Sequence, residues 1–133
     1  MKKQFLVLVA ALCLCGVAFA KKFPVTASPT VPAARGELDV SHDKNGNERV
    51  KLGVEHLADP ASLTPPGGTY VVWIQSRGGN PENQGRLKVD KNLKASFETV
   101  TPYKDFQLTI TAELDPTAKT PSGMQVLSVN VQP

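Results

Sequence analysis

The side chains best suited to holding a metal are few and lie far apart in the sequence. There are two histidines, His42 and His56, and both cysteines, Cys13 and Cys15, fall within residues 1–20. Met124 is the one methionine beyond that stretch. A blue-copper site needs a Cys, two His and usually a Met, and a structural zinc site needs four ligands. The sequence therefore predicts no metal site and places the histidines at a surface or edge.

A second candidate for cation binding is a short stretch rich in acid and amide groups. Asp43, Asn45 and Asn47 have the spacing of the first calcium ligands of an EF-hand loop. The match then fails, because Glu48 stands where the loop needs glycine and Val54 where it needs a bidentate glutamate. An Asn-Gly hairpin turn explains the same residues, so we favour a turn over a calcium site.

No arrangement of nucleophile, acid and base is visible. Ser41 precedes His42, but neither a Gly-x-Ser-x-Gly sequence nor a flanking His and Asp pair accompanies them. Glu113 and Asp115 end a predicted strand, where carboxylates more often protect an edge or accept hydrogen bonds from loop amides. We predict that the protein is not an enzyme and uses no cofactor.

Tyr70 and Trp73, the latter the single Trp of the chain, allow two interpretations. A Trp in a central sandwich strand usually packs between the two sheets, and we favour that structural role. The alternative function is a carrier that binds a small molecule or a carbohydrate on these two rings. Apolar residues fall on both parities of this stretch, which predicts that the strand is covered on both faces.

We expect contact with other molecules at two long polar loops, residues 77–84 and 115–123. Binding residues are commonly found on loops that a rigid scaffold holds in place. The candidate contact residues are Arg77, Asn80, Glu82, Asn83, Asp115 and Lys119.

The elements that would hold these loops are short alternating strands. The predicted strands cover residues 36–41, 49–55, 69–76, 85–89, 93–99, 106–113 and 125–131. About seven strands with turn signals every eight to twelve residues are typical of an immunoglobulin-like β-sandwich, which is the predicted fold of residues 36–133. The proline-bearing connection 57–68 is expected to cross between sheets, and residues 21–35 are expected to form a proline-rich tether.

Residues 1–20 read as an export signal. Lys2 and Lys3 precede an uncharged apolar run, and the stretch ends in the small residues required at a signal-peptidase site. We predict cleavage after Ala20 and a secreted or periplasmic protein, with an uncleaved anchor and a lipidated Cys15 as alternatives. After cleavage 13 basic and 12 acidic residues remain, a formal charge of +1. That balance indicates neither a nucleic acid nor an anionic membrane as partner.

Several short motifs resemble the extracytoplasmic C-terminal domain of membrane-bound anti-sigma factors of the sigma-K-regulator type. They are Tyr70-x-x-Trp73, Gly79-x-Pro81, Gly85-x-Leu87, Phe97, Leu108-x-Ile110-Thr111-x-Glu113 and Pro121-x-Gly123. The resemblance implies a sensing or protein-contact module. It does not extend to sigma-factor binding, because only a signal segment precedes the domain here. We therefore expect a non-catalytic exported module that contacts an unknown protein or envelope component, with an envelope structural subunit as a further alternative.

Overall fold

The computed structural model describes residues 20–133, and its eight strands pair antiparallel throughout. The strands are β1 (Lys21–Ala27), β2 (Arg35–His42), β3 (Glu48–Glu55), β4 (Thr69–Ser76), β5 (Glu82–Leu87), β6 (Ala95–Thr101), β7 (Phe106–Glu113) and β8 (Met124–Val131). A short 3-10 turn, η1 (Pro60–Ser62), lies between β3 and β4. The prediction of an all-β fold is confirmed.

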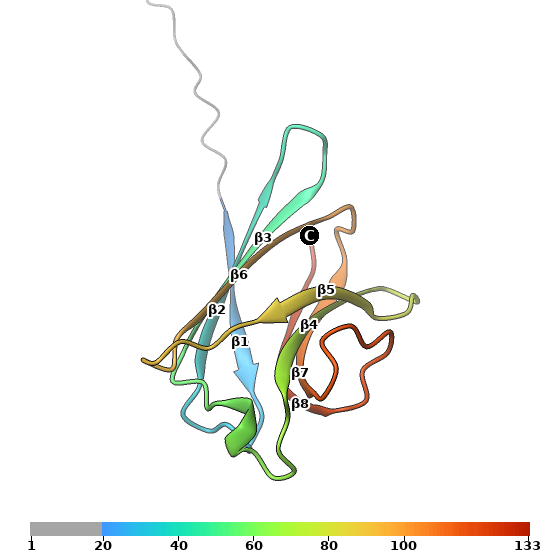
Figure 1. Ribbon diagram of the computed structural model, residues 1–133. Coiled ribbons are helices and arrows are strands. Elements are labelled where there is room, and N and C mark those ends of the chain that lie inside the picture. Colours follow the sequence, from blue (N-terminus) through green and yellow to red (C-terminus); the bar gives the residue numbers. More distant parts are fainter. Residues whose placement is uncertain (1–19) are drawn as a thin grey trace, which may run out of the picture.

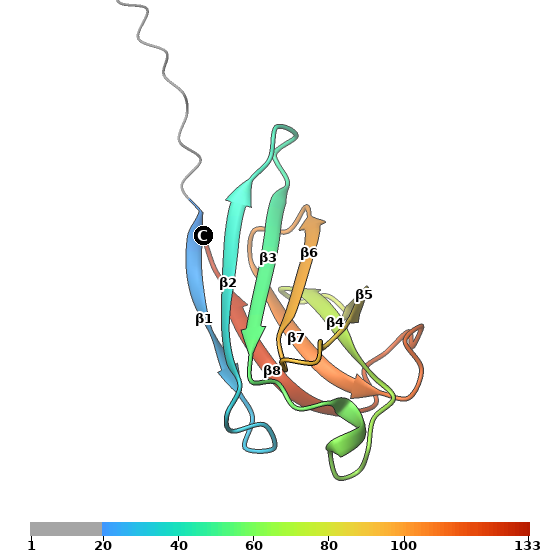
Figure 2. The ribbon, with the colours of Figure 1, turned by 60° about the vertical axis from the view of Figure 1, so that its left-hand side comes forward.

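The eight strands form one sheet that bends back on itself until it is nearly closed as a barrel (Figure 1). Their order is β5-β4-β7-β8-β1-β2-β3-β6. Figure 2 shows β1, β2, β3 and β6 in a near layer and β4, β5, β7 and β8 behind it. β1 joins the layers, because residues 21–25 pair with β2 whereas residues 26 and 27 pair with β8. The 57–68 connection leads from β3 in one layer to β4 in the other, but both layers belong to one sheet, whereas the prediction was a crossing between two sheets.

Side chains of β6 and of the segment just after it join the two edge strands, β5 and β6. The Thr99 hydroxyl donates to Gln84 Oε1 at 3.0 Å, and the Tyr103 hydroxyl donates to Glu82 Oε1 at 2.7 Å. Gly85 lies beside the ring of Phe97 and has a φ of 127°, a backbone conformation that residues other than glycine rarely adopt. These contacts close the seam without a backbone ladder.

The space between the layers is filled by alternate residues of the strands. In β3, Val50, Leu52 and Val54 are buried, whereas the residues between them are exposed. In β7, Leu108 and Ile110 supply the same inner face. This period-two pattern is the one that predicted the strands, and each buried apolar side chain contributes about 1.5–3 kcal/mol relative to exposure.

The structure differs from the prediction in two ways: the strands belong to one sheet rather than to two facing sheets, and β1 makes eight strands rather than about seven. Residues 21–27, assigned to the tether, lie in the sheet because Phe23 and Val25 alternate with exposed residues and pack against the core. Pro24 is accommodated because it lies in the half of β1 that pairs with β2 alone, which leaves one edge of the strand free of ladder bonds there.

Residues 1–19 of the predicted signal segment, residues 1–20, lie outside the described residues, so cleavage after Ala20 stays a prediction. Within residues 20–133, no helix has the length and apolar character needed to cross a membrane.

Candidate functional site

The two loops expected to contact other molecules approach each other on one side of the molecule. Residues 81–85, at the start of β5, and residues 116–119, between β7 and β8, line one open groove of about 640 Å³. We call this surface the contact face, and we call residues 114–123 the strap. In Figure 1 the strap is the loop between β7 and β8, and it extends beside β4 and β5.

The strap is fastened to β5 by a single amide side chain. Asn83 Nδ2 donates to the carbonyl oxygens of Pro116 and Ala118, at 3.0 and 2.9 Å, while its Oδ1 accepts from the Gly85 N–H at 2.8 Å. Every polar atom of this side chain therefore has a partner. The position of residues 116–118 is fixed relative to the edge of the sheet.

The turn within the strap has its own hydrogen bonds. Asp115 Oδ1 accepts from the Thr117 hydroxyl at 2.7 Å and from the Thr117 N–H at 2.8 Å. The hydroxyl and then the amide of Thr117 hold the pKa of Asp115 below its ordinary value. The backbone of Ala118 also donates to the Asp115 carbonyl at 3.2 Å. The strap is therefore ordered by its own residues as well as by β5.

The far end of the strap is fastened to β7 by Glu113, which is only 1% exposed. Its carboxylate accepts from the Ser122 hydroxyl at 2.7 Å, the Ser122 N–H at 3.1 Å and the Gly123 N–H at 2.8 Å. Burial opposes ionisation of Glu113, but hydrogen bonds from Thr111, Ser122 and Gly123 outweigh it and lower its pKa. The prediction that this carboxylate accepts hydrogen bonds from loop amides is confirmed.

Trp73 pairs with Asn83, the residue that holds the strap, across β4 and β5. We infer from this pairing that the strap covers the face of β4 on which Trp73 lies. It is fully buried and its Nε1–H donates to Thr111 Oγ1 at 2.8 Å. Trp73 and its neighbour Val71 do not belong to the inner core cluster, which contains Val72 and Ile74 from the other face of the strand. Burial of Trp73 and cover on both faces of β4 are confirmed. Its predicted place between the two sheets is wrong, because its parity points it outward.

Tyr70 lies on the opposite face of β4, within the inner core. It is fully buried, its hydroxyl donates to the Ala58 carbonyl at 2.6 Å, and burial raises its pKa to about 12. Tyr70 and Trp73 therefore point to opposite sides of one strand. The two rings present no common surface on which a ligand could stack in this structure.

Three of the predicted contact residues, Glu82, Asn83 and Lys119, line the contact face, and Asp115 shapes the strap beside it. Arg77 lies elsewhere, 3.5 Å from Asp105 in a separate shallow groove. The structure leaves Asn80 exposed in the turn before β5 but does not place it in the groove.

Of the residues on the contact face that were not predicted as contact residues, Gln84 and Thr117 are the two with polar side chains. Gln84 is the extra residue of a β-bulge opposite Val72 and Trp73, and bulges commonly re-aim side chains at sheet edges. Glycine inside a strand-like run, here Gly85, is the sequence signal that points to such a bulge.

The other chemical candidates occupy structural positions. Asp43 Oδ1 accepts from the amides of Asn45 and Asn47 at 2.8 and 2.9 Å, and Gly46 has a φ of 78°, which confirms the hairpin turn. His42 and His56 are both exposed. Among the described residues, no three His, Cys, Asp or Glu side chains are grouped so that they could hold a metal ion.

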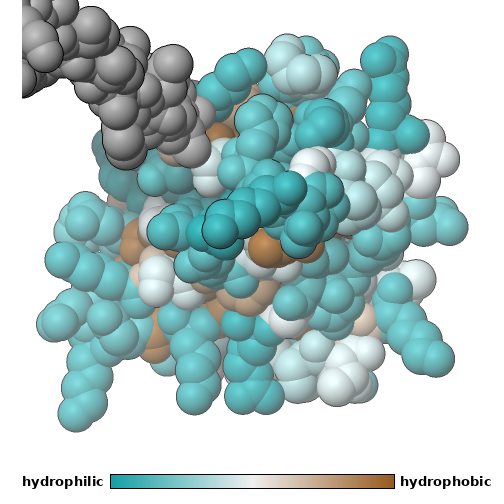
Figure 3. Space-filling model, turned by 90° about the horizontal axis from the view of Figure 1, so that it is seen from above, coloured by the Kyte–Doolittle hydropathy of each residue, from teal (hydrophilic) through white to brown (hydrophobic). Residues whose placement is uncertain are grey.

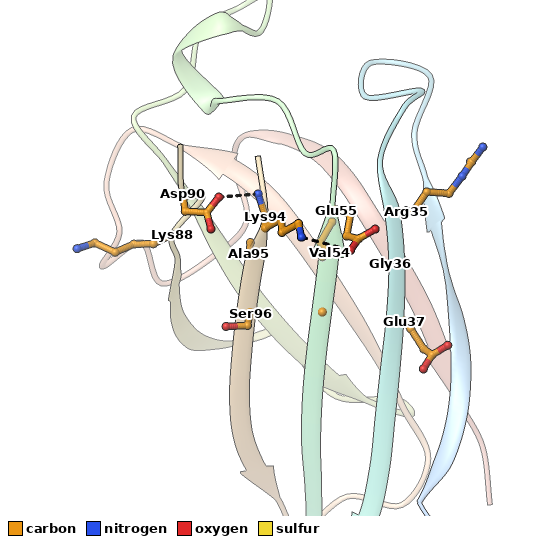
Figure 4. Close-up of a pocket in the computed structure, with 11 residues that line it drawn as sticks. Arg35, Gly36, Glu37, Val54, Glu55, Lys88, Asp90, Lys94, Ala95 and Ser96 are labelled. Carbon is orange, nitrogen blue, oxygen red and sulfur yellow. Dashed lines mark hydrogen bonds and ion pairs between the residues drawn. The ribbon is translucent and has the colours of Figure 1, made fainter. Parts of the chain in front are cut away.

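A larger open groove, of about 690 Å³, runs over the ends of β2, β3 and β6 (Figure 4). Its charged side chains do not converge: Lys94 pairs with Glu55 at 3.9 Å, whereas Lys88 and Arg35 extend away from each other. Because a specific site needs polar groups aimed at one point, this groove is a solvated sheet surface.

The chain matches no protein-family model and no curated protein sequence. The resemblance to anti-sigma-factor domains therefore stays a prediction, and the contact face is the basis for assigning a function.

Proposed function

We propose that the protein is an exported, non-catalytic β-domain that contacts another protein or an envelope component through the contact face. In this proposal its two layers correspond to an immunoglobulin-like sandwich whose β1 joins them. The observation that carries the proposal is the fastening of the strap at both ends, by Asn83 and by Glu113.

Fastening supports a binding role because ordering a flexible loop on association costs free energy, about 0.5–1.5 kcal/mol for each immobilised side chain. A strap held in one conformation before binding avoids much of that cost. The exposed residues at its tip, Thr117 and Lys119, lie beside exposed Glu82 of β5. Together they offer hydrogen-bond donors and acceptors and both signs of charge, as a polar interface needs.

The resemblance to anti-sigma-factor domains is consistent with this role, since in that family the corresponding module lies outside the cytoplasm and senses or contacts proteins. Sigma-factor binding is not part of the proposal. The export signal places the contact in the periplasm or outside the cell, if residues 1–20 act as expected.

Site-specific photo-crosslinking tests the proposal. A photoreactive residue is placed at Lys119 on the contact face and, as a control, at Lys51, which is exposed on the outer face of β3. The proposal predicts that the Lys119 position captures one species of defined mass from native envelope material and that the Lys51 position does not. The same pattern at both positions, or no product at Lys119, would overturn it.

A further inference from the structure

The end of the molecule that lies uppermost in Figure 1 contains a small cavity. There the first residues of β1, the β2–β3 hairpin and the last residues of β8 come together. The cavity has a volume of about 90 Å³, which is the space of about three water molecules. Phe23, Val40 and Val131 form its apolar wall. Seen from above, this end is largely hydrophilic, with small hydrophobic patches between the polar residues (Figure 3).

A buried carboxylate lies beside this cavity. Glu48 is 4% exposed and occupies the inner row of β3 that otherwise consists of aliphatic residues. Its Oε1 accepts from His42 Nδ1 and from Lys104 Nζ, both at 2.7 Å. Lys104 Nζ also donates to the Gly46 carbonyl at 3.1 Å. Burying a charge is costly unless it is paired, and here the pairing holds His42 and Lys104 at the cavity.

The charged side chains that line the cavity favour an anion. Lys21 and Lys104 contribute two positive charges against the one side-chain carboxylate of Glu48. A lysine ammonium carries three donors, and Lys104 uses two of them, on Glu48 and on Gly46. One donor therefore remains for a ligand.

We propose that this cavity binds a small organic anion, a monocarboxylate with a short unbranched apolar tail. The tail packs against Phe23, Val40 and Val131, and the carboxylate accepts hydrogen bonds from Lys104 and Lys21. The volume limits the tail to a few carbon atoms. Glu48 is a positioning residue, because it acts on the ligand through Lys104 and His42. The proposal is independent of the contact face.

A purely structural role for the same residues makes a different prediction. Glu48 and Lys104 also tie the β2–β3 turn to the segment between β6 and β7. If this were their whole function, the cavity would bind no anion, and a change that narrows the cavity but leaves the ion pairs intact would alter nothing in a ligand titration. The substitution Val40→Leu makes that change, since it adds one methylene to the apolar wall.

The test is a titration of the isotopically labelled protein with sodium butyrate, followed by NMR. Saturable shift changes are expected at the methyl groups of Val40 and Val131 and at the ring of Phe23. They should be lost in Lys104→Met and in Val40→Leu but kept in Lys51→Met, which removes a lysine from the opposite face of β3.

n-Butylammonium, which has the same tail and the opposite charge, is the control ligand. Butyrate shifts that do not saturate, or that survive in Lys104→Met, would overturn the proposal. Equal or tighter binding of n-butylammonium would overturn the choice of an anion. If Lys104→Met fails to fold, the test is the Val40→Leu variant, which retains every ion pair around Glu48. Butyrate shifts that survive in Val40→Leu would then overturn the proposal.

Discussion

Replacing Glu113 with glutamine should release the end of the strap that is fastened to β7. The Glu113 carboxylate accepts from the Ser122 hydroxyl, the Ser122 amide and the Gly123 amide while it is almost wholly buried. Glutamine has nearly the same shape but only one acceptor oxygen, and its NH₂ group would face a backbone donor. Hydrogen bonds to a charged group contribute about 1.5–3 kcal/mol, and an unsatisfied buried donor costs about 1–3 kcal/mol. We expect the unfolding free energy to fall by about 2–4 kcal/mol.

Trp73 provides a local signal for this change, because it is the single Trp of the chain, is buried and pairs with Asn83, which holds the strap. In Glu113→Gln without denaturant, its emission should shift to the red and acrylamide should quench it more strongly. Urea unfolding followed by circular dichroism gives the global loss of stability. The control is Glu98→Gln, whose exposed carboxylate lies 3.7 Å from Arg49 and should contribute less than about 1 kcal/mol.

The effect should also depend on pH in a defined direction. Because the pKa of Glu113 is lowered in the folded protein, its charge stabilises the fold fully above the unfolded carboxyl pKa and progressively less as the pH falls through the folded value. Wild type and Glu113→Gln should therefore converge in stability on acidification. Two results would refute the role assigned to the Glu113 charge. One is a difference in unfolding free energy between wild type and Glu113→Gln that stays constant with pH, and the other is a Glu113→Gln variant that is as stable as Glu98→Gln.

Three further predictions concern single contacts. Gly123→Ala should lower the unfolding free energy by about 2 kcal/mol or more, because a Cβ there overlaps the Ala112 carbonyl oxygen. The control is Gly53→Ala, which has open space around it and should be neutral or slightly stabilising. Thermal unfolding compares the two variants. Tyr70→Phe should lower the unfolding free energy by about 1–3 kcal/mol in urea titrations, because it leaves the Ala58 carbonyl without its donor. Asn83→Ala should increase acrylamide quenching of the buried indole while the far-ultraviolet circular dichroism stays unchanged, and unaltered quenching would count against the fastening at β5.

Most of the fold prediction came from the alternation of apolar and polar side chains. Strands β3, β4 and β7 lie almost where the apolar parity placed them, because a strand with one buried face must alternate with period two. β6 begins two residues later than predicted, at Ala95, since Leu93 has a φ of 59° and lies 42% exposed in the preceding turn. β1 was missed because three prolines in its neighbourhood are typical of an extended tether.

The candidate site was predictable only in part. Long polar loops indicated where contacts would lie, and Asn83 and Asp115 were named from them. No local pattern shows that Asn83 holds residues 116–118, because that contact joins positions more than 30 residues apart through one side chain. The outward position of Trp73 follows from its parity. Its burial on that face was not predictable from local sequence, because the polar strap that Asn83 holds beside it has no alternation that would predict where it packs.

The two buried acidic residues of the described chain, Glu48 and Glu113, have equivalent roles on opposite faces of the sheet. Each accepts several hydrogen bonds, and each thereby fixes a segment that is not part of a strand: the β2–β3 turn and loop 102–105 for Glu48, and the strap for Glu113. A well-packed apolar residue would often stabilise such a position at least as well as a buried charge. What a carboxylate provides and an aliphatic side chain does not is directional hydrogen bonding, to backbone amides at Glu113 and to the His42 and Lys104 side chains at Glu48. Both proposed sites therefore lie where loop geometry is set before any ligand arrives, and weakening either carboxylate should reduce binding by increasing the cost of ordering the loop.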